Sequence, residues 1–91
     1  VANMRDGANA GFKYFDCKGV SGISIRVRGY CSGAFGVKTK WDGEVLGWIP
    51  VEFSNEWKEY RADIAVPDGI QALYFVYKGT GAANLASFTL E

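Results

Sequence analysis

The stretch from residue 70 to residue 90 constrains the fold of this chain more than any other. It reads IQALYFVYKGTGAANLASFTL: an apolar and aromatic run, a glycine-rich bend and a second, shorter run. Residues 70–77 offer no polar face, which is typical of a strand in the middle of a sandwich, covered on both sides. Lys78-Gly79-Thr80-Gly81 is expected to break this run. Apolar and polar residues then alternate to Leu90, which predicts a closing strand with one face inward.

Several other segments alternate between apolar and polar residues, the signature of a strand with one buried face. Residues 23–28 and 59–64 follow this pattern. Residues 35–41 follow it as well, which predicts that Trp41 packs in the core.

A tight hairpin is predicted at Asp42-Gly43. Its second strand is expected at residues 45–53, where Pro50 cannot donate a ladder hydrogen bond and therefore indicates a sheet edge or a bulge. Strands at spacings of about 8 to 12 residues, with turns between them, are typical of an all-β sandwich. Because no segment shows helical periodicity, a repeat or a linker, residues 1–91 are predicted to form a single domain.

Charge and length argue against several classes of partner. The chain has 10 basic and 10 acidic residues, so nothing indicates binding to nucleic acid or to an anionic membrane. A transmembrane helix needs about 20 consecutive apolar residues, and every apolar run here is far shorter. No signal peptide is visible because Arg5 and Asp6 interrupt the first segment, so a secretion signal would lie upstream of Val1.

Four basic residues could form a stripe on one outward sheet face: Arg26, Arg28, Lys38 and Lys40. Such a stripe could attract an acidic polysaccharide or nucleic acid. We favour a solvated face balanced by acids such as Glu59 and Asp63, because the net charge is zero.

The sequence offers little for catalysis. It has no histidine, which removes the commonest general base and the commonest metal ligand together. Four aspartates, Asp6, Asp16, Asp42 and Asp68, lie beside glycines or at strand ends, where turn chemistry accounts for them. We therefore predict that the chain is not an enzyme.

The two cysteines, Cys17 and Cys31, allow one disulfide at most. The predicted strand between them holds them apart, whereas a bridge needs Cα atoms within about 7 Å. Two free thiols that fill apolar gaps are expected instead.

Four segments of the chain form an ordered set of short motifs. They are VANMRDG at the start, GEVLGWIPV at residues 43–51, NEWKEYRADI at residues 55–64, and LYFVYKG followed by a glycine loop, Asn84 and SFTL. In order and spacing this set resembles the family 6 carbohydrate-binding modules. It is most similar to the C-terminal modules of glycoside hydrolase family 43 xylosidases and arabinofuranosidases. The resemblance narrows the sandwich to a jelly roll. It also implies a non-catalytic module of a secreted plant-polysaccharide hydrolase.

The resemblance implies a ligand cleft at the loop end of the sandwich, where two aromatic rings enclose a sugar and an asparagine bonds to it. Trp57 matches one ring and Asn84 the asparagine, whereas the position of the other ring falls on Asn9. A single ring loses a stack worth about 1 kcal/mol, so weak binding is expected. Packing for Trp57 and turn formation for Asn84 remain alternatives.

Family members begin with a further strand, and they often hold calcium with acids from that strand and an aspartate of the last one. This chain starts after that strand, and Ala86 takes the place of the aspartate. We therefore expect a jelly roll that lacks its first strand, no calcium site and no other cofactor. The open sheet edge predicts association between copies of the chain.

Two functions follow from these observations, ahead of a third reading as a fibronectin-like sandwich with no link to sugars. The first is a weak binder of xylan or arabinoxylan, as a polysaccharide or as an oligosaccharide. The second is a structural β-sandwich that packs on a glycoside hydrolase domain and has no affinity for sugar.

Overall fold

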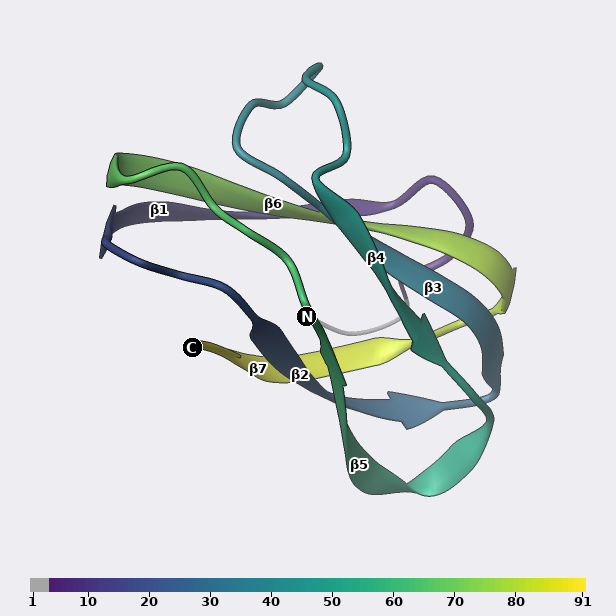
Figure 1. Ribbon diagram of the computed structural model, residues 1–91. Helices are drawn as coiled ribbons and strands as arrows, with labels where there is room; N and C mark the ends of the chain where they lie inside the picture. The colour runs from purple at the N-terminus through teal and green to yellow at the C-terminus, as the bar shows by residue number, and fades with distance from the viewer. Residues whose placement is uncertain (1–3) are drawn as a thin grey trace.

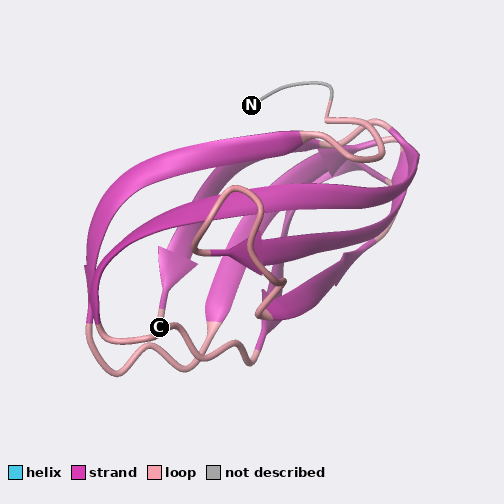
Figure 2. Ribbon diagram, turned by 90° about the horizontal axis from the view of Figure 1, so that it is seen from above, coloured by secondary structure: helices cyan, strands magenta, loops and turns pink. Residues whose placement is uncertain are grey.

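The computed structural model describes residues 4–91, which form strands and loops throughout (Figures 1 and 2). The strands are β1 (Asn9–Cys17), β2 (Ile23–Gly29), β3 (Cys31–Lys38), β4 (Gly47–Val51), β5 (Ser54–Ala62), β6 (Gly69–Gly81) and β7 (Asn84–Leu90). One antiparallel sheet has the order β1-β6-β3-β4, and the second has the order β5-β2-β7. Within this part of the chain no helix is long and apolar enough to span a membrane.

The two sheets pack face to face as the layers of a sandwich (Figure 1). The chain crosses between the sheets at most connections, and the two sheet orders are those of a jelly roll in which one position, beside β7, is not filled by the described residues. The predicted all-β jelly roll is therefore confirmed. The outer edge of β7 has no neighbouring strand within residues 4–91.

The core lies between the sheets. Ile23, Ile25 and Val27 of β2 point into it, as their alternation predicts, and each is at most 1% exposed. The facing sheet contributes large side chains from β3, β4 and β6: Phe35, Val37, Ile49, Leu73, Phe75 and Tyr77. Each sheet thus buries one face and turns the other outward.

Strand β6 lies in the middle of its sheet, between β1 and β3, but only one of its faces is covered by the other layer. Ile70 is 68% exposed, so the prediction of cover on both sides is wrong there. Val76 faces outward and is nevertheless buried, because the Trp48 ring and Val76 both lie over Gly36 of the strand between them. No third layer covers this outer face, and a neighbouring side chain of the same sheet shields Val76 from solvent instead.

The predicted break at residues 78–81 is also wrong, because β6 continues to Gly81, which pairs with Cys31. Gly79 faces Gly33 across the strand pair, and a Cβ atom added to Gly79 would clash with the carbonyl oxygen of Ser32. The glycines permit a close approach of two strands, so they extend the sheet instead of ending it.

The connection from β3 to β4 is longer than a tight hairpin. Strand β3 ends at Lys38, and the amide of Gly43 donates a hydrogen bond to the carbonyl oxygen of Lys40 at 3.1 Å, which closes a turn inside the loop. Trp41 therefore lies outside the sheet, 61% exposed, with its ring edge-on to Tyr74 at 5.7 Å. The prediction of a core position is wrong because the alternation continues past the end of the strand. Strand β4, which contains Pro50, does lie at a sheet edge, as predicted.

Both cysteines are buried and unbridged, as predicted. Cys17 ends β1 and Cys31 begins β3. Of the first matched motif, residues 1–3 lie outside the described part of the chain, and Met4 forms an isolated bridge with Ala83.

Candidate functional site

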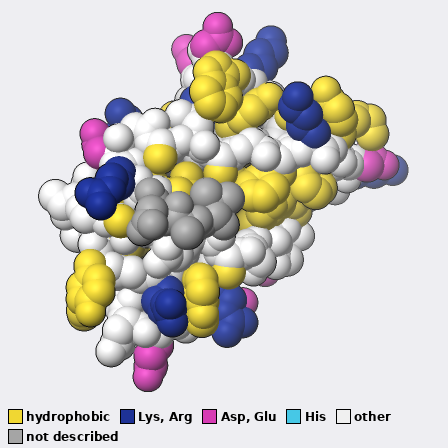
Figure 3. Space-filling model, turned by 180° about the vertical axis from the view of Figure 1, so that it is seen from behind, with side chains coloured by type: hydrophobic (Ala, Val, Ile, Leu, Met, Phe, Trp, Pro, Cys, Tyr) yellow, Lys and Arg dark blue, Asp and Glu magenta, His cyan; other side chains and the backbone are white. Residues whose placement is uncertain are grey.

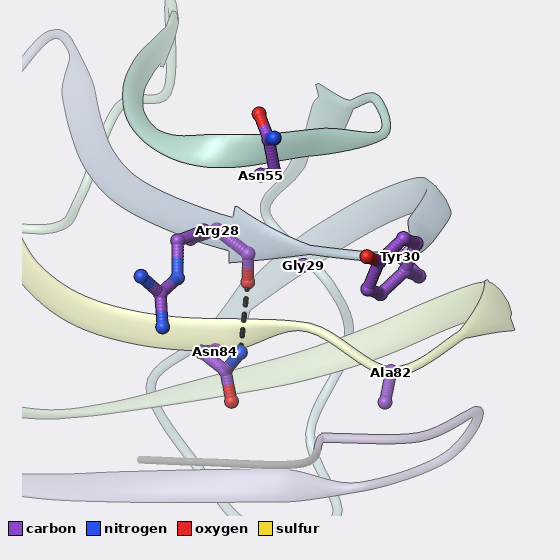
Figure 4. A pocket seen from close by; sticks show the side chains of 6 residues that line it. All are labelled: Arg28, Gly29, Tyr30, Asn55, Ala82 and Asn84. Atoms are coloured by element: carbon purple, nitrogen blue, oxygen red, sulfur yellow. Dashed lines mark hydrogen bonds between the residues drawn. The ribbon is translucent and has the colours of Figure 1, made fainter.

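A pocket lies at the end of the sandwich where β2 turns into β3 and β6 turns into β7 (Figure 4). We call it the loop-end pocket; its volume is about 310 Å³. Its lining residues are Arg28, Gly29, Tyr30, Asn55, Ala82 and Asn84. They supply a guanidinium group, two carboxamides and a phenol, which are groups able to bond to several hydroxyls.

Asn84 and Arg28 are register partners on the neighbouring strands β7 and β2. The Nδ2 atom of Asn84 donates a hydrogen bond to the carbonyl oxygen of Arg28 at 3.1 Å, which ties the start of β7 to the end of β2. Figure 4 shows both side chains on one side of the loop-end pocket. The asparagine that the sequence predicts at the site therefore lines the loop-end pocket. Its hydrogen bond also fixes the two strands that border this pocket.

Trp57 lies on β5, on the other side of β2. The Cζ atom of Arg28 lies 5.2 Å from the centroid of the Trp57 ring, a cation–π contact. Trp57 is 39% exposed, in agreement with its predicted outward position. Trp57 does not line the loop-end pocket itself, but Arg28, which it contacts, does. Trp57 on β5, Arg28 on β2 and Asn84 on β7 thus follow one another across the three strands of the smaller sheet.

Tyr30 provides a second ring at the pocket. It occupies the turn between β2 and β3, is 74% exposed and packs against Phe53 with ring centroids 4.9 Å apart. Neither Tyr30 nor Asn55 was a candidate from the sequence. Both lie at or beside turns, where no periodicity marks which side chains converge.

Asn9 lies elsewhere. It begins β1 in the larger sheet, opposite Val76 of β6, and is not one of the residues that line the loop-end pocket. Its Nδ2 atom donates to the carbonyl oxygen of Gly7 at 3.2 Å. The structure thus brings Trp57 and Asn84 together around Arg28 without Asn9, whose part in binding stays a prediction.

A larger depression of about 530 Å³ follows the seam between β1 and β7. Its lining residues are Phe12, Phe15, Ala86, Ser87, Phe88, Thr89 and Leu90. The rings of Phe12 and Phe15 both pack on Phe88, and no amide or charged side chain faces the depression. A specific site for a polar ligand needs convergent polar groups, so the loop-end pocket is the better candidate.

The thiols are poorly suited to nucleophilic chemistry. Burial raises the pKa of Cys17, and the nearby carboxylates of Asp16 and Asp68 raise it further. Burial raises the pKa of Cys31 as well. A reactive cysteine needs the opposite shift. Within residues 4–91 no group of three or more acidic or cysteine side chains is placed to hold a metal ion.

The chain is similar to a glycosidase by sequence and to a carbohydrate-binding module by structure. It is 67% identical over 90 residues to a xylosidase/arabinosidase of Thermoclostridium stercorarium, covering 99% of this chain and 19% of that protein. Its fold matches a family 6 carbohydrate-binding module from Clostridium cellulolyticum solved with xylose, with a TM-score of 0.88 and 21% identity over 99% of this chain and 76% of the other.

The fold also matches part of a glycoside hydrolase family 43 arabinoxylan arabinofuranohydrolase from Bacillus subtilis, solved with cellotetraose. Here the TM-score is 0.85, with 19% identity over 98% of this chain and 20% of that enzyme. No protein-family model matches the chain. The chain spans about a fifth of each of these two enzymes, and its fold is that of the family 6 carbohydrate-binding modules.

Proposed function

We propose that this chain is a non-catalytic carbohydrate-binding module of a secreted hydrolase that acts on xylan or arabinoxylan. Its ligand would be a plant cell-wall polysaccharide or oligosaccharide, held in the loop-end pocket. The single observation that carries this proposal is the convergence of Tyr30, Asn84 and Arg28, with Trp57 beside Arg28, at one end of a sandwich that has the fold of sugar-binding modules.

The chemistry of the pocket suits a sugar. An apolar sugar face stacks on aromatic rings, and its hydroxyls exchange hydrogen bonds with amide and phenol groups. Tyr30 offers an exposed ring at the pocket, and Asn55 and Asn84 offer amides. None of the residues that line the pocket is an acid, so a glycosidase pair of carboxylates is missing from its lining.

The hydrolase context rests on the relatives. The chain is similar to short parts of two large enzymes whose names state xylosidase/arabinosidase and arabinoxylan arabinofuranohydrolase activities. A module that keeps such an enzyme on an insoluble substrate acts outside the cell, which supports secretion. The catalytic activity would belong to another domain of the protein.

We expect the affinity to be low. The rings of Trp57 and Tyr30 are both exposed and six residues line the pocket, so binding must offset the lost freedom of ligand and protein with few contacts. A dissociation constant in the millimolar range, about 4 kcal/mol, is the expected value.

Isothermal titration with xylohexaose and cellohexaose tests the proposal. We expect millimolar binding of at least one of the two, and at least about fivefold weaker binding for Tyr30→Ala, which removes one ring. The variant Phe53→Ala is the control. Phe53 packs on Tyr30 but does not line the pocket, so this variant should lose less affinity than Tyr30→Ala. Failure of both sugars to bind at concentrations well above 1 mM would contradict the proposal.

One observation favours the second function, a structural module that packs on a hydrolase domain. Large apolar side chains reach the surface away from the loop-end pocket, among them Trp41 and Trp48, which are 61% and 45% exposed. Figure 3 shows hydrophobic side chains at several places on one face of the molecule. An exposed apolar patch is typical of an interaction surface. A folded domain without affinity for any glycan would favour this function.

A further inference from the structure

We propose that the loop-end pocket prefers glycans that carry a carboxylate, such as xylo-oligosaccharides substituted with a uronic acid, and that the guanidinium group of Arg28 binds this carboxylate. The inference rests on the proposed sugar-binding function of the same pocket and adds the class of sugar that it selects.

The four basic residues that could have formed one stripe are divided between the two sheets: Arg26 and Arg28 lie on β2, whereas Lys38 ends β3 and Lys40 follows it. Lys38 is buried, with its Nζ atom donating to the carbonyl oxygen of Trp41 at 2.8 Å. Arg26 stands opposite Glu59 in the register of β2 and β5. Of these four residues, Arg28 alone lines the loop-end pocket.

Arg28 has no carboxylate partner within residues 4–91, because the ion pairs of this part of the chain join Arg61 to Asp63 and to Glu91. The other residues that line the pocket are uncharged, so Arg28 gives the pocket one positive charge that no other lining residue neutralises. A neutral sugar leaves this charge unpaired, whereas a uronate pairs with it.

The contact with Trp57 prepares Arg28 for such a partner. A guanidinium group is planar, and stacking on an indole uses its face, while its N–H donors remain at its edge. The Cζ atom lies 5.2 Å from the Trp57 ring centroid. Because the side chain is held by the ring, less freedom is lost when its edge binds a carboxylate.

The neighbouring groups suit the rest of such a ligand. Asn55, Asn84 and the hydroxyl of Tyr30 are neutral and can bond to sugar hydroxyls. A charge-assisted hydrogen bond is about twice as strong as a neutral one. For an exposed arginine we expect this difference to give about fivefold tighter binding of the acidic sugar at low salt.

Isothermal titration can measure this preference as a ratio of affinities. The ligands are xylohexaose and the same oligosaccharide with one glucuronic acid substituent, at ionic strengths of about 0.01 M and about 1 M, where the Debye length falls from about 30 to about 3 Å. The wild-type protein should bind the acidic ligand about fivefold more tightly at low salt, and the ratio should approach one at high salt.

Variants assign the preference to one side chain. Arg28→Gln should bring the ratio to about one, whereas Arg28→Lys, which keeps the charge, should retain part of it. Arg26→Gln is the matched control: it removes the same charge two residues away on the same strand, outside the pocket, and should leave the ratio at about fivefold.

Equal affinity for both ligands in the wild type, or an unchanged ratio in Arg28→Gln, would overturn the inference and leave the proposed function intact. Failure of both ligands to bind would overturn the proposed function and this inference with it. Because each variant is compared with itself on two ligands, a general loss of affinity does not imitate a change in preference.

Discussion

Replacing Trp57 by alanine tests whether this ring binds sugar or only packs. A tryptophan buries about 200 Å² when enclosed, and Trp57 leaves 39% of its surface exposed. At about 25 cal/mol per Å², the buried remainder contributes at most about 3 kcal/mol to the free energy of unfolding. A domain of 91 residues typically has about 5 to 14 kcal/mol, so Trp57→Ala should stay folded with a lower melting temperature.

Binding should suffer more than folding. Removal of one stacked ring costs about 1 kcal/mol, at least fivefold in affinity, and Arg28 loses the ring that holds its side chain. From a starting value of about 1 mM, this loss moves the dissociation constant to about 5 mM or above. Titration calorimetry with xylohexaose gives the affinity, and circular dichroism during heating gives the melting temperature.

Trp48→Ala is the matched control. Trp48 is 45% exposed, so its truncation removes a similar side chain, but it lies on β4 of the other sheet and away from the loop-end pocket. We expect Trp48→Ala to lower the melting temperature and to leave the affinity unchanged. If Trp57→Ala binds like the wild type, or if it unfolds, then Trp57 is a packing residue and does not bind sugar.

Four further predictions concern other parts of the molecule. If Asn9 marks a ring position, Asn9→Trp should tighten binding of xylohexaose several-fold; an unchanged affinity in calorimetry would leave Tyr30 as the second ring. Ala86 takes the place of the aspartate that binds calcium in similar modules, so millimolar calcium should not raise the melting temperature. A rise that a chelator reverses would show that a calcium site is present. The open edge of β7 should promote association, visible as a concentration-dependent mass in sedimentation; a monomer at every concentration would argue against it. Burial raises the pKa of the Tyr77 hydroxyl above its value of about 10 in the unfolded chain, so the free energy of unfolding should be fully present below about pH 10 and fall above it. Denaturant unfolding of Tyr77→Phe should show a smaller fall than the wild type, and an equal fall would exclude Tyr77 as the cause.

The inward faces of the strands could be predicted because a strand alternates strictly. Ile23, Ile25 and Val27 face the core, as that period requires. The same pattern misplaces Trp41, since alternation does not show where backbone pairing ends, and β3 ends at Lys38. The glycines at residues 79 and 81 signal a bend in the sequence, and only the facing Gly33 shows that they serve close packing of strands.

The candidate site could be predicted only in part. Trp57 was found because its phase places it outside the core, and Asn84 because it matches a motif. Tyr30 and Asn55 lie at or beside turns, where sequence spacing carries no information about which side chains converge. The sequence pattern groups Arg28 with other basic residues, and its place at the pocket depends on the register between β2 and β7, which no local pattern encodes.

Whether the loop-end pocket binds a xylan-derived sugar can be seen directly by nuclear magnetic resonance titration of the labelled protein with xylohexaose. We expect concentration-dependent shifts in the amides of Gly29, Tyr30 and Asn55, in the side-chain amide of Asn84 and in the indole N–H of Trp57. The indole signals of Trp41 and Trp48 should stay in place. No shift in the pocket signals at about 10 mM sugar, ten times the expected dissociation constant, would show that this pocket is not the sugar site, and so would shifts confined to Trp41 and Trp48.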